Sequence, residues 1–93
     1  FRGVLQETSP TDYNWITYIY SADIERFEPP ACNEGVLEWV PLDRVTDLPT
    51  YAVDHVVYRF YREGRPFVLD ARYDGEMNLL SVVDELSGER IAM

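Results

Sequence analysis

The chain contains no lysine, although it has eight basic residues, and it has a single cysteine, Cys32. One cysteine excludes an internal disulfide, so we expect a reducing, cytoplasmic compartment. No apolar run approaches the ~20 residues that a membrane-spanning helix needs, and no signal peptide is visible, so no membrane partner is predicted. Seventeen acidic residues bring the formal net charge to -9, which argues against binding to the phosphate backbone of a nucleic acid polymer.

Aromatic residues are abundant, at 14% of the 93 residues, and this argues against disorder. The length allows a single domain with a small core. The chain starts with Phe1 rather than Met and enters strand-like sequence at once, which we interpret as an internal cut. Residues 1–93 are therefore expected to form one partial domain, in which the polar residues 87–93 fray.

Hydrophobic periodicity and turn residues predict five strands and one long helix. The strands are expected over residues 1–8, 15–22, 36–40, 66–73 and 77–86. Short helical turns are expected over 42–48, and an amphipathic helix over 50–63 with Gly64 as its cap. The Asp74-Gly75 pair predicts a tight hairpin between the last two strands. The fold class is therefore α+β, with a mostly antiparallel sheet.

The predicted sheet has more apolar surface than one helix can cover. In the second strand Trp15 points to one face, whereas Ile16 and Tyr18 point to the other, because side chains alternate along a strand. Both faces of this strand are therefore apolar. We expect another element to pack on the face that the helix leaves open.

The most informative segment is Asn33–Asp43, with the sequence NEGVLEWVPLD. Glu34 and Glu38 lie four residues apart, so they share one side if the strand starts this early. Two carboxylates on one side could bind Mg²⁺, because hard cations take oxygen ligands. A glutamate pair on a surface is more often simply solvated. Trp39, in the same segment, is expected to lie in the core.

This segment resembles the one that follows the metal-binding helix in Nudix (MutT-like) nucleotide pyrophosphohydrolases. The predicted order of strand, strand, acidic loop, Trp-containing strand, Leu-Pro turn, helix and terminal hairpin is similar to the second half of a Nudix domain. The family signature Gly-x5-Glu-x7-Arg-Glu-x2-Glu-Glu-x-Gly is not found in residues 1–93. The resemblance implies a Nudix-like mixed sheet with helices packed on it, of which this chain is the second half of the α/β/α sandwich only.

The resemblance also implies an activity, the hydrolysis of a nucleoside diphosphate linked to another group, with Mg²⁺ or Mn²⁺ as cofactor. Sanitising of oxidised nucleotides of the 8-oxo-dGTP type belongs to this class. In the family, a glutamate five residues before a tryptophan ligates a catalytic metal or serves as general base, and Glu34 stands five residues before Trp39. The catalytic and metal-binding role is therefore assigned to Glu34. Most of the family's metal ligands come from the signature helix, so this chain alone is expected to be inactive.

Tyr51 and Asp54 are the candidate substrate-binding residues. Nudix enzymes that act on oxidised purine nucleotides often place an aromatic residue and one or two acids between a Leu-Pro turn and a helix, where they stack on the base and bind its edge. The segment Leu48–Asp54 reads LPTYAVD, with tyrosine where that subgroup usually has tryptophan. Asp54 could equally serve the helix, because an acid in the first turn complements the helix dipole.

His55 and Cys32 are weaker candidates for catalysis, and a non-catalytic binding module is the alternative function. His55, the only histidine, could act as a general base, but a lone histidine at a helix start is more often a surface residue. Cys32 has no histidine near it in sequence, so a nucleophilic role is not expected. The alternative function is a non-catalytic module that binds a partner or itself through exposed aromatic residues. The expected partners are a nucleotide substrate, a missing N-terminal half of the domain or another chain, and a second copy in a homo-oligomer.

Overall fold

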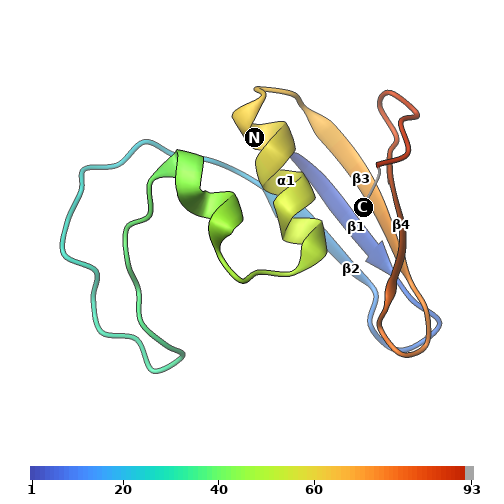
Figure 1. The fold of residues 1–93 in the computed structure, drawn as a ribbon, viewed down its shortest axis with the longest axis horizontal. Helices are drawn as coiled ribbons and strands as arrows, with labels where there is room; N and C mark the ends of the chain where they lie inside the picture. The colour runs from blue at the N-terminus through green and yellow to red at the C-terminus, as the bar shows by residue number, and fades with distance from the viewer. Residues whose placement is uncertain (92–93) are drawn as a thin grey trace.

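The computed structural model describes residues 1–91, which form a mixed α+β fold (Figure 1). Its elements, in chain order, are β1 (Gly3–Thr8), β2 (Trp15–Ile19), the 3-10 helix η1 (Leu42–Asp47), α1 (Ala52–Arg62), β3 (Phe67–Tyr73) and β4 (Leu79–Asp84). The α+β prediction is confirmed. Within residues 1–91, no helix has the length and apolar character that crossing a membrane requires.

The sheet has four strands in the order β2-β1-β3-β4. β1 pairs with β2, and β3 with β4, in antiparallel hairpins, as predicted. The second hairpin lacks the tight Asp-Gly turn that was expected, because residues 74–78 separate its strands and the positive φ of 64° belongs to Met77 rather than Gly75. The two hairpins join through β1 and β3, which run parallel, with Leu5 opposite Leu69 and Glu7 opposite Ala71. A parallel pair needs a long crossover, which η1 and α1 provide. The expectation of five strands is therefore corrected to four among the described residues, whereas the mostly antiparallel character is confirmed, because two of the three pairings are antiparallel.

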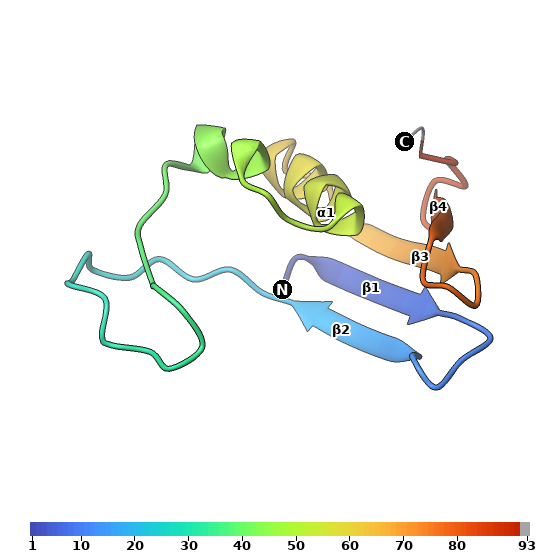
Figure 2. The same ribbon diagram turned by 60° about the horizontal axis from the view of Figure 1, so that its bottom comes forward.

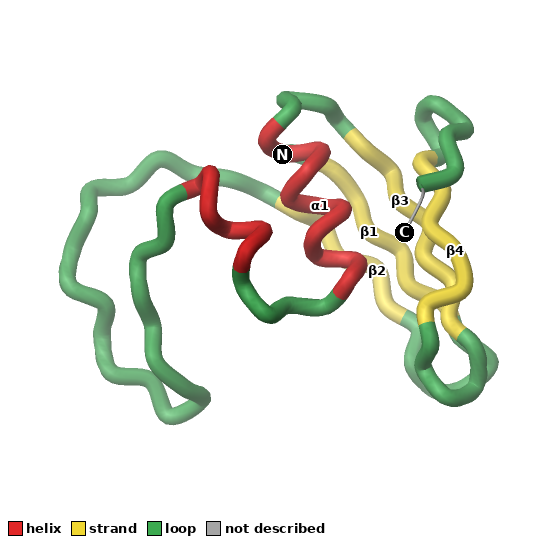
Figure 3. Tube along the Cα trace, in the orientation of Figure 1, coloured by secondary structure: helices red, strands yellow, loops and turns green. Residues whose placement is uncertain are grey.

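The predicted strand over residues 36–40 is wrong. This segment belongs to a long loop, residues 20–41, that extends away from the sheet (Figures 1 and 3). Its alternating apolar residues find no neighbouring strand to pair with among the described residues. The isolated bridge within this loop joins Cys32 and Gly35, outside residues 36–40. Trp39 is also outside the core, at 40% exposed. Its ring packs edge-on against Phe27, and its indole N–H donates to the Phe27 carbonyl at 2.6 Å.

The hydrophobic core lies between α1 and one face of the sheet. The apolar stripe predicted for α1 comprises Val53, Val56, Val57, Phe60 and Tyr61, of which the first four are buried and Tyr61 is half-buried. It packs with inward-facing sheet residues and one residue after β4, namely Leu5, Phe67, Leu69, Ala71, Val82 and Ile91. Gly64, with φ of 67°, ends the helix as expected.

Gly3 allows the closest approach in this core. A Cβ atom at this position would stand 2.5 Å from Cδ2 of Phe67, well inside van der Waals contact. The Phe67 ring cannot move away freely, because it is buried and packs edge-on against Phe60 with ring centroids 5.9 Å apart. The absence of a side chain at Gly3 thus makes room for the pair of rings beneath α1.

The opposite face of the sheet has no helix over it among residues 1–91 (Figure 2). Strand register places Val4 beside both Tyr18 and Val68 on this face. Ile16 and Tyr18 are 57% and 62% exposed. The expectation of an apolar surface that the helix leaves open is therefore confirmed for the described residues.

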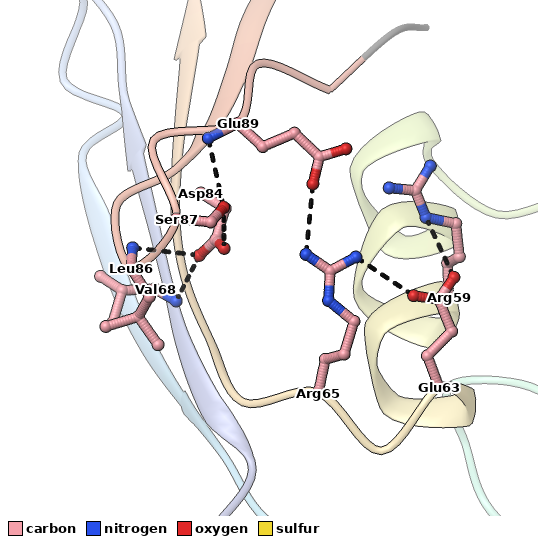
Figure 4. A network of polar contacts seen from close by, with 8 residues as sticks. All are labelled: Arg59, Glu63, Arg65, Val68, Asp84, Leu86, Ser87 and Glu89. Carbon is pink, nitrogen blue, oxygen red and sulfur yellow. Dashed lines mark hydrogen bonds and ion pairs between the residues drawn. The ribbon is translucent and has the colours of Figure 1, made fainter.

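A cluster of hydrogen bonds holds the end of the chain against the sheet (Figure 4). Asp84, at 2% exposed, accepts hydrogen bonds from the backbone N–H groups of Val68 and Leu86 and from the Ser87 hydroxyl. The chain then turns back, so that Ile91 lies in the core and its N–H donates to the Val82 carbonyl. Residues 87–91 of the tail predicted to fray are therefore tied to the sheet by hydrogen bonds, although only Ile91 is buried, and residues 92 and 93 lie outside the described part.

Ion pairs next to this cluster tie the tail to the end of α1 (Figure 4). Arg65 bridges Glu63 and Glu89, at 3.2 Å to each, and its guanidinium lies over the Phe60 ring. Arg59 adds a longer pair to Glu63. All four charged side chains are substantially exposed, so solvent screens these pairs and we expect them to add little to stability.

Candidate functional site

A cavity of about 400 Å³ opens where the first turn of α1 faces the turn ends of both hairpins. Seven residues line it, and they comprise three tyrosines, two acids and two apolar residues: Tyr13, Tyr51, Tyr73, Glu7, Asp54, Val53 and Met77. None of these lining residues is an arginine. The cavity is therefore aromatic and acidic, and it brings together both predicted substrate-binding residues, Tyr51 and Asp54.

Glu7 forms the buried end of this cavity. It follows Gly3 and Leu5 on the face of β1 that points to α1, and it is only 8% exposed. The Tyr73 hydroxyl donates a hydrogen bond of 2.6 Å to its Oε2 atom. The Tyr13 hydroxyl approaches its Oε1 atom at 3.5 Å, the outer limit of a hydrogen bond.

Tyr51 and Asp54 come from the first turn of α1. Tyr51 is the residue before the helix, and the Asp54 N–H donates to its carbonyl at 3.0 Å. The Tyr51 ring is 82% exposed and forms the outer wall of the cavity, whereas Asp54 is half-buried. A second cavity of about 290 Å³, between β2 and α1, shares Glu7 and Asp54 with the first. The two carboxylates thus stand where the two cavities meet.

The electrostatics of the cavity follow from these neighbours. Burial raises the pKa of the Tyr73 phenol above its ordinary value of 10.0, and the hydrogen bond to Glu7 and the charges of Glu7 and Asp54 raise it further. The pKa of Tyr13 is also raised, by partial burial and then by Glu7. Both phenols therefore stay protonated at neutral pH and serve as hydrogen-bond donors.

An aromatic wall runs along one side of the cavity. The Tyr13 ring packs edge-on against Tyr73 with centroids 6.1 Å apart, and against Trp15 with centroids 6.0 Å apart. The Thr11 hydroxyl reaches the Met77 sulfur at 3.9 Å, so the turns of the two hairpins touch at the cavity mouth. This wall places the indole of Trp15 next to a cavity-lining ring.

Glu34, the predicted catalytic and metal-binding residue, is not among the residues that line either cavity. It is exposed in the loop of residues 20–41, where its N–H donates to the Cys32 sulfur at 3.4 Å. Cys32 is an exposed free thiol, and His55 is half-buried on α1. The structure therefore brings Tyr51 and Asp54 together in one site, whereas Glu34 stands apart from it.

Within residues 1–91, no group of three or more His, Cys, Asp or Glu side chains could hold a metal ion. Mg²⁺ prefers about six oxygen ligands, several of which are water. Glu34 would supply one carboxylate, and the remaining ligands would have to come from elsewhere.

Sequence reasoning missed Glu7, Tyr13 and Tyr73. The sequence does mark Glu7 as unusual. Gly3 and Leu5 lie on the inward face of β1, and strand alternation predicts an apolar residue at the next inward position, where the chain has an acid. Tyr13 and Tyr73 each lie next to a turn, and nothing local in the sequence brings the two turns together. Only the pairing of β1 with β3 does so.

No family model matches this chain, and no solved structure matches it. The relationship to Nudix hydrolases therefore stays a prediction from the sequence, and the function has to be argued from the cavity itself.

Proposed function

We propose that this chain is the nucleotide-binding part of a Nudix-like metal-dependent pyrophosphohydrolase of the cytoplasm. The observation that carries the proposal is the cavity that holds both Tyr51 and Asp54, the residues to which the sequence resemblance assigns base recognition. The same resemblance supplies the class of reaction, hydrolysis of a nucleoside diphosphate linked to another group.

The chemistry of the cavity favours the base of a nucleotide over its phosphates. Exposed and half-buried phenol rings offer flat surfaces on which a planar base can stack. The carboxylate of Asp54 accepts hydrogen bonds and therefore suits the N–H groups on a base edge. Phosphates are repelled by Glu7 and Asp54, so we expect them to lie outside the cavity mouth.

Hydrolysis would need groups beyond the described residues. In the family resemblance, Glu34 contributes one carboxylate to the Mg²⁺ or Mn²⁺ ions that this class of reaction uses. One carboxylate alone makes a weak magnesium site, because the ion takes several oxygen ligands. We therefore expect the 93-residue chain to bind nucleotides but to show negligible turnover with Mg²⁺.

Calorimetric titration of guanosine monophosphate and adenosine monophosphate into the chain tests the proposal. We expect Tyr51→Ala and Asp54→Asn each to weaken binding by about tenfold. This is the loss of affinity expected when one stacking contact, or one hydrogen bond to a charged group, is removed. Tyr20→Ala and Asp43→Asn are matched controls, because both side chains are exposed and line neither cavity. The proposal fails if neither nucleotide binds, or if the cavity variants bind like the controls.

A second candidate function, a non-catalytic module that associates with a partner or with itself, is favoured by the uncovered sheet face. The chain exposes 7099 Å², whereas a compact protein of its mass exposes about 5,600 Å². The excess of roughly 1,500 Å² on this one chain is about twice the ~800 Å² that each partner buries in a standard protein interface. Part of it belongs to the loop of residues 20–41, and part to the face that carries Ile16 and Tyr18.

We propose that another segment, another chain or a second copy covers this face. Sedimentation equilibrium of the wild type and of an Ile16→Ser, Tyr18→Ser variant separates this role from nucleotide binding. Self-association that the variant abolishes supports the second function. A wild type that stays monomeric at high concentration contradicts self-association and leaves a different segment or chain as the partner to be sought.

A further inference from the structure

The position of Glu7 is unusual for a charged residue. It sits in a central strand, paired on one side with Trp15 of β2 and on the other with Ala71 of β3, and it faces the core. Burying a carboxylate is costly unless hydrogen bonds compensate for the water it loses. An apolar residue here would continue the inward face that Leu5 begins, so packing alone does not account for a glutamate.

The hydrogen bonds to Glu7 compensate only part of this cost. Its Oε2 atom has a short, strong bond from the Tyr73 hydroxyl at 2.6 Å. Its Oε1 atom has only the Tyr13 hydroxyl at 3.5 Å, which is too long to be a strong bond. No arginine among the described residues forms an ion pair with Glu7. One oxygen of a buried carboxylate therefore retains acceptor capacity, and this carboxylate lines both cavities.

We infer that Glu7 is a specificity-determining residue of this site, whose Oε1 atom accepts a hydrogen bond from an exocyclic amino group of the bound base. The ligand class rests on the proposed function, but the role of Glu7 rests on its own burial and hydrogen bonds. A site that buries an acceptor discriminates strongly, because a ligand without the donor leaves that acceptor unpaired. The site then selects bases that carry an amino group over otherwise identical bases that lack it.

Rigid surroundings suit Glu7 to this role. Its backbone is paired on both sides within the sheet, and Tyr73 fixes one of its two oxygens. The other oxygen is thereby held in a defined direction, and a preorganised acceptor loses little entropy on binding. Asp54, on the first turn of α1, is the second acceptor of the same cavity.

Two pairs of nucleosides test the inference, because the members of each pair differ by one amino group. Guanosine is compared with inosine, and adenosine with purine riboside, by calorimetric titration into the 93-residue chain. In at least one pair, the amino-bearing nucleoside is expected to bind about tenfold to hundredfold more tightly, the value of a hydrogen bond to a charged group.

The variant that removes this preference is Glu7→Met combined with Tyr73→Phe. Methionine has a similar shape without acceptor oxygens, and the second change removes the hydroxyl that would otherwise lose its partner. Replacing both members of a buried hydrogen bond by apolar groups is nearly neutral for stability, so the variant is expected to fold. Circular dichroism checks the fold, and Glu85→Met, at an exposed glutamate, is the matched control.

The inference predicts that the wild type and Glu85→Met prefer the amino-bearing nucleoside and that the double variant does not. It is overturned if the nucleosides bind but neither pair shows a preference, or if the double variant keeps the preference. In both of these cases the proposed function stands, because nucleosides still bind. If no nucleoside binds the wild type, the proposed function and the role of Glu7 fail together.

Discussion

Replacing Tyr73 by phenylalanine is expected to destabilise the chain, because it removes the short hydrogen bond to the buried carboxylate of Glu7. Loss of a partner for a buried acceptor costs about 1–3 kcal/mol. Glu7 also lines a cavity of about 400 Å³, which is large enough to admit water in place of the hydroxyl. We therefore expect a loss of about 1 kcal/mol, near the lower end of this range.

The matched control is Tyr13→Phe, which makes the same chemical change against the same carboxylate. The Tyr13 hydroxyl is 3.5 Å from Glu7 and its ring is exposed, so its removal should cost less than about 0.5 kcal/mol. In thermal melts followed by circular dichroism, about 1 kcal/mol lowers the Tm of a domain of this size by about 4–8 °C. Equal shifts in the two variants, or none in Tyr73→Phe, would refute the reasoning.

The pH dependence of this contact follows from the raised pKa of Tyr73. A group with a folded pKa above its unfolded value contributes stability that is complete below the unfolded pKa, about 10 for tyrosine, and is lost as the pH rises through the folded pKa. The wild type should therefore lose stability above about pH 10 more steeply than Tyr73→Phe does. When the appearance of phenolate is followed by near-ultraviolet absorbance, the variant should show one fewer tyrosine that ionises above the ordinary pKa of tyrosine.

Three further predictions concern the scaffold. Asp84→Asn should lower the free energy of unfolding by about 1–3 kcal/mol in urea denaturation at pH 7. Burial opposes ionisation of Asp84, but its hydrogen bonds hold its pKa below the usual value, so this loss should shrink as the pH falls below about 4. A loss that stays constant with pH would contradict this. Gly3→Ala should destabilise by about 1–3 kcal/mol, because its Cβ would meet the ring of Phe67, and a neutral effect in the same assay would show that the ring can move. Phe60→Ala should cost about 3–5 kcal/mol, whereas Trp39→Ala, outside the core, should cost far less, and equal denaturation midpoints would contradict the placement of the core.

Local patterns in the sequence predict the elements whose causes are local. The stripe that includes Val53 and Phe60 predicts α1 and its buried face, because the helical period alone decides which side is apolar. The Asp74-Gly75 pair predicts where the turn between β3 and β4 lies, because both residue types favour turns, although the positive φ of this turn falls on Met77 rather than Gly75. In both cases the residues that specify the element lie within or next to it.

Pairing over long distances was not predictable in the same way. Residues 3–8 pair with residues 67–72, and no single segment encodes this partnership. The same pairing brings Glu7 near Tyr73 and creates the buried end of the cavity. Sequence reasoning therefore singled out the two cavity-lining residues at the start of α1, Tyr51 and Asp54, but missed the lining residues contributed by the sheet.

The segment of residues 36–40 shows the converse error. Its alternating apolar residues favour a strand, but alternation decides only which side chains share a face. A strand also needs a neighbour for its backbone hydrogen bonds, and this segment has none among the described residues. Trp39 accordingly packs on Phe27 within the loop rather than in the core.

The central claim is that the cavity between α1 and the sheet binds the base of a nucleotide. Chemical-shift mapping of backbone amides during a titration with guanosine monophosphate tests it most directly, because it reports the place of binding as well as its strength. Binding in this cavity should shift the amide signals of Glu7, Tyr51, Asp54 and Tyr73 most strongly, and these shifts should saturate together. Shifts confined to the loop around Glu34 or to the open sheet face, or no shifts at all, would contradict it.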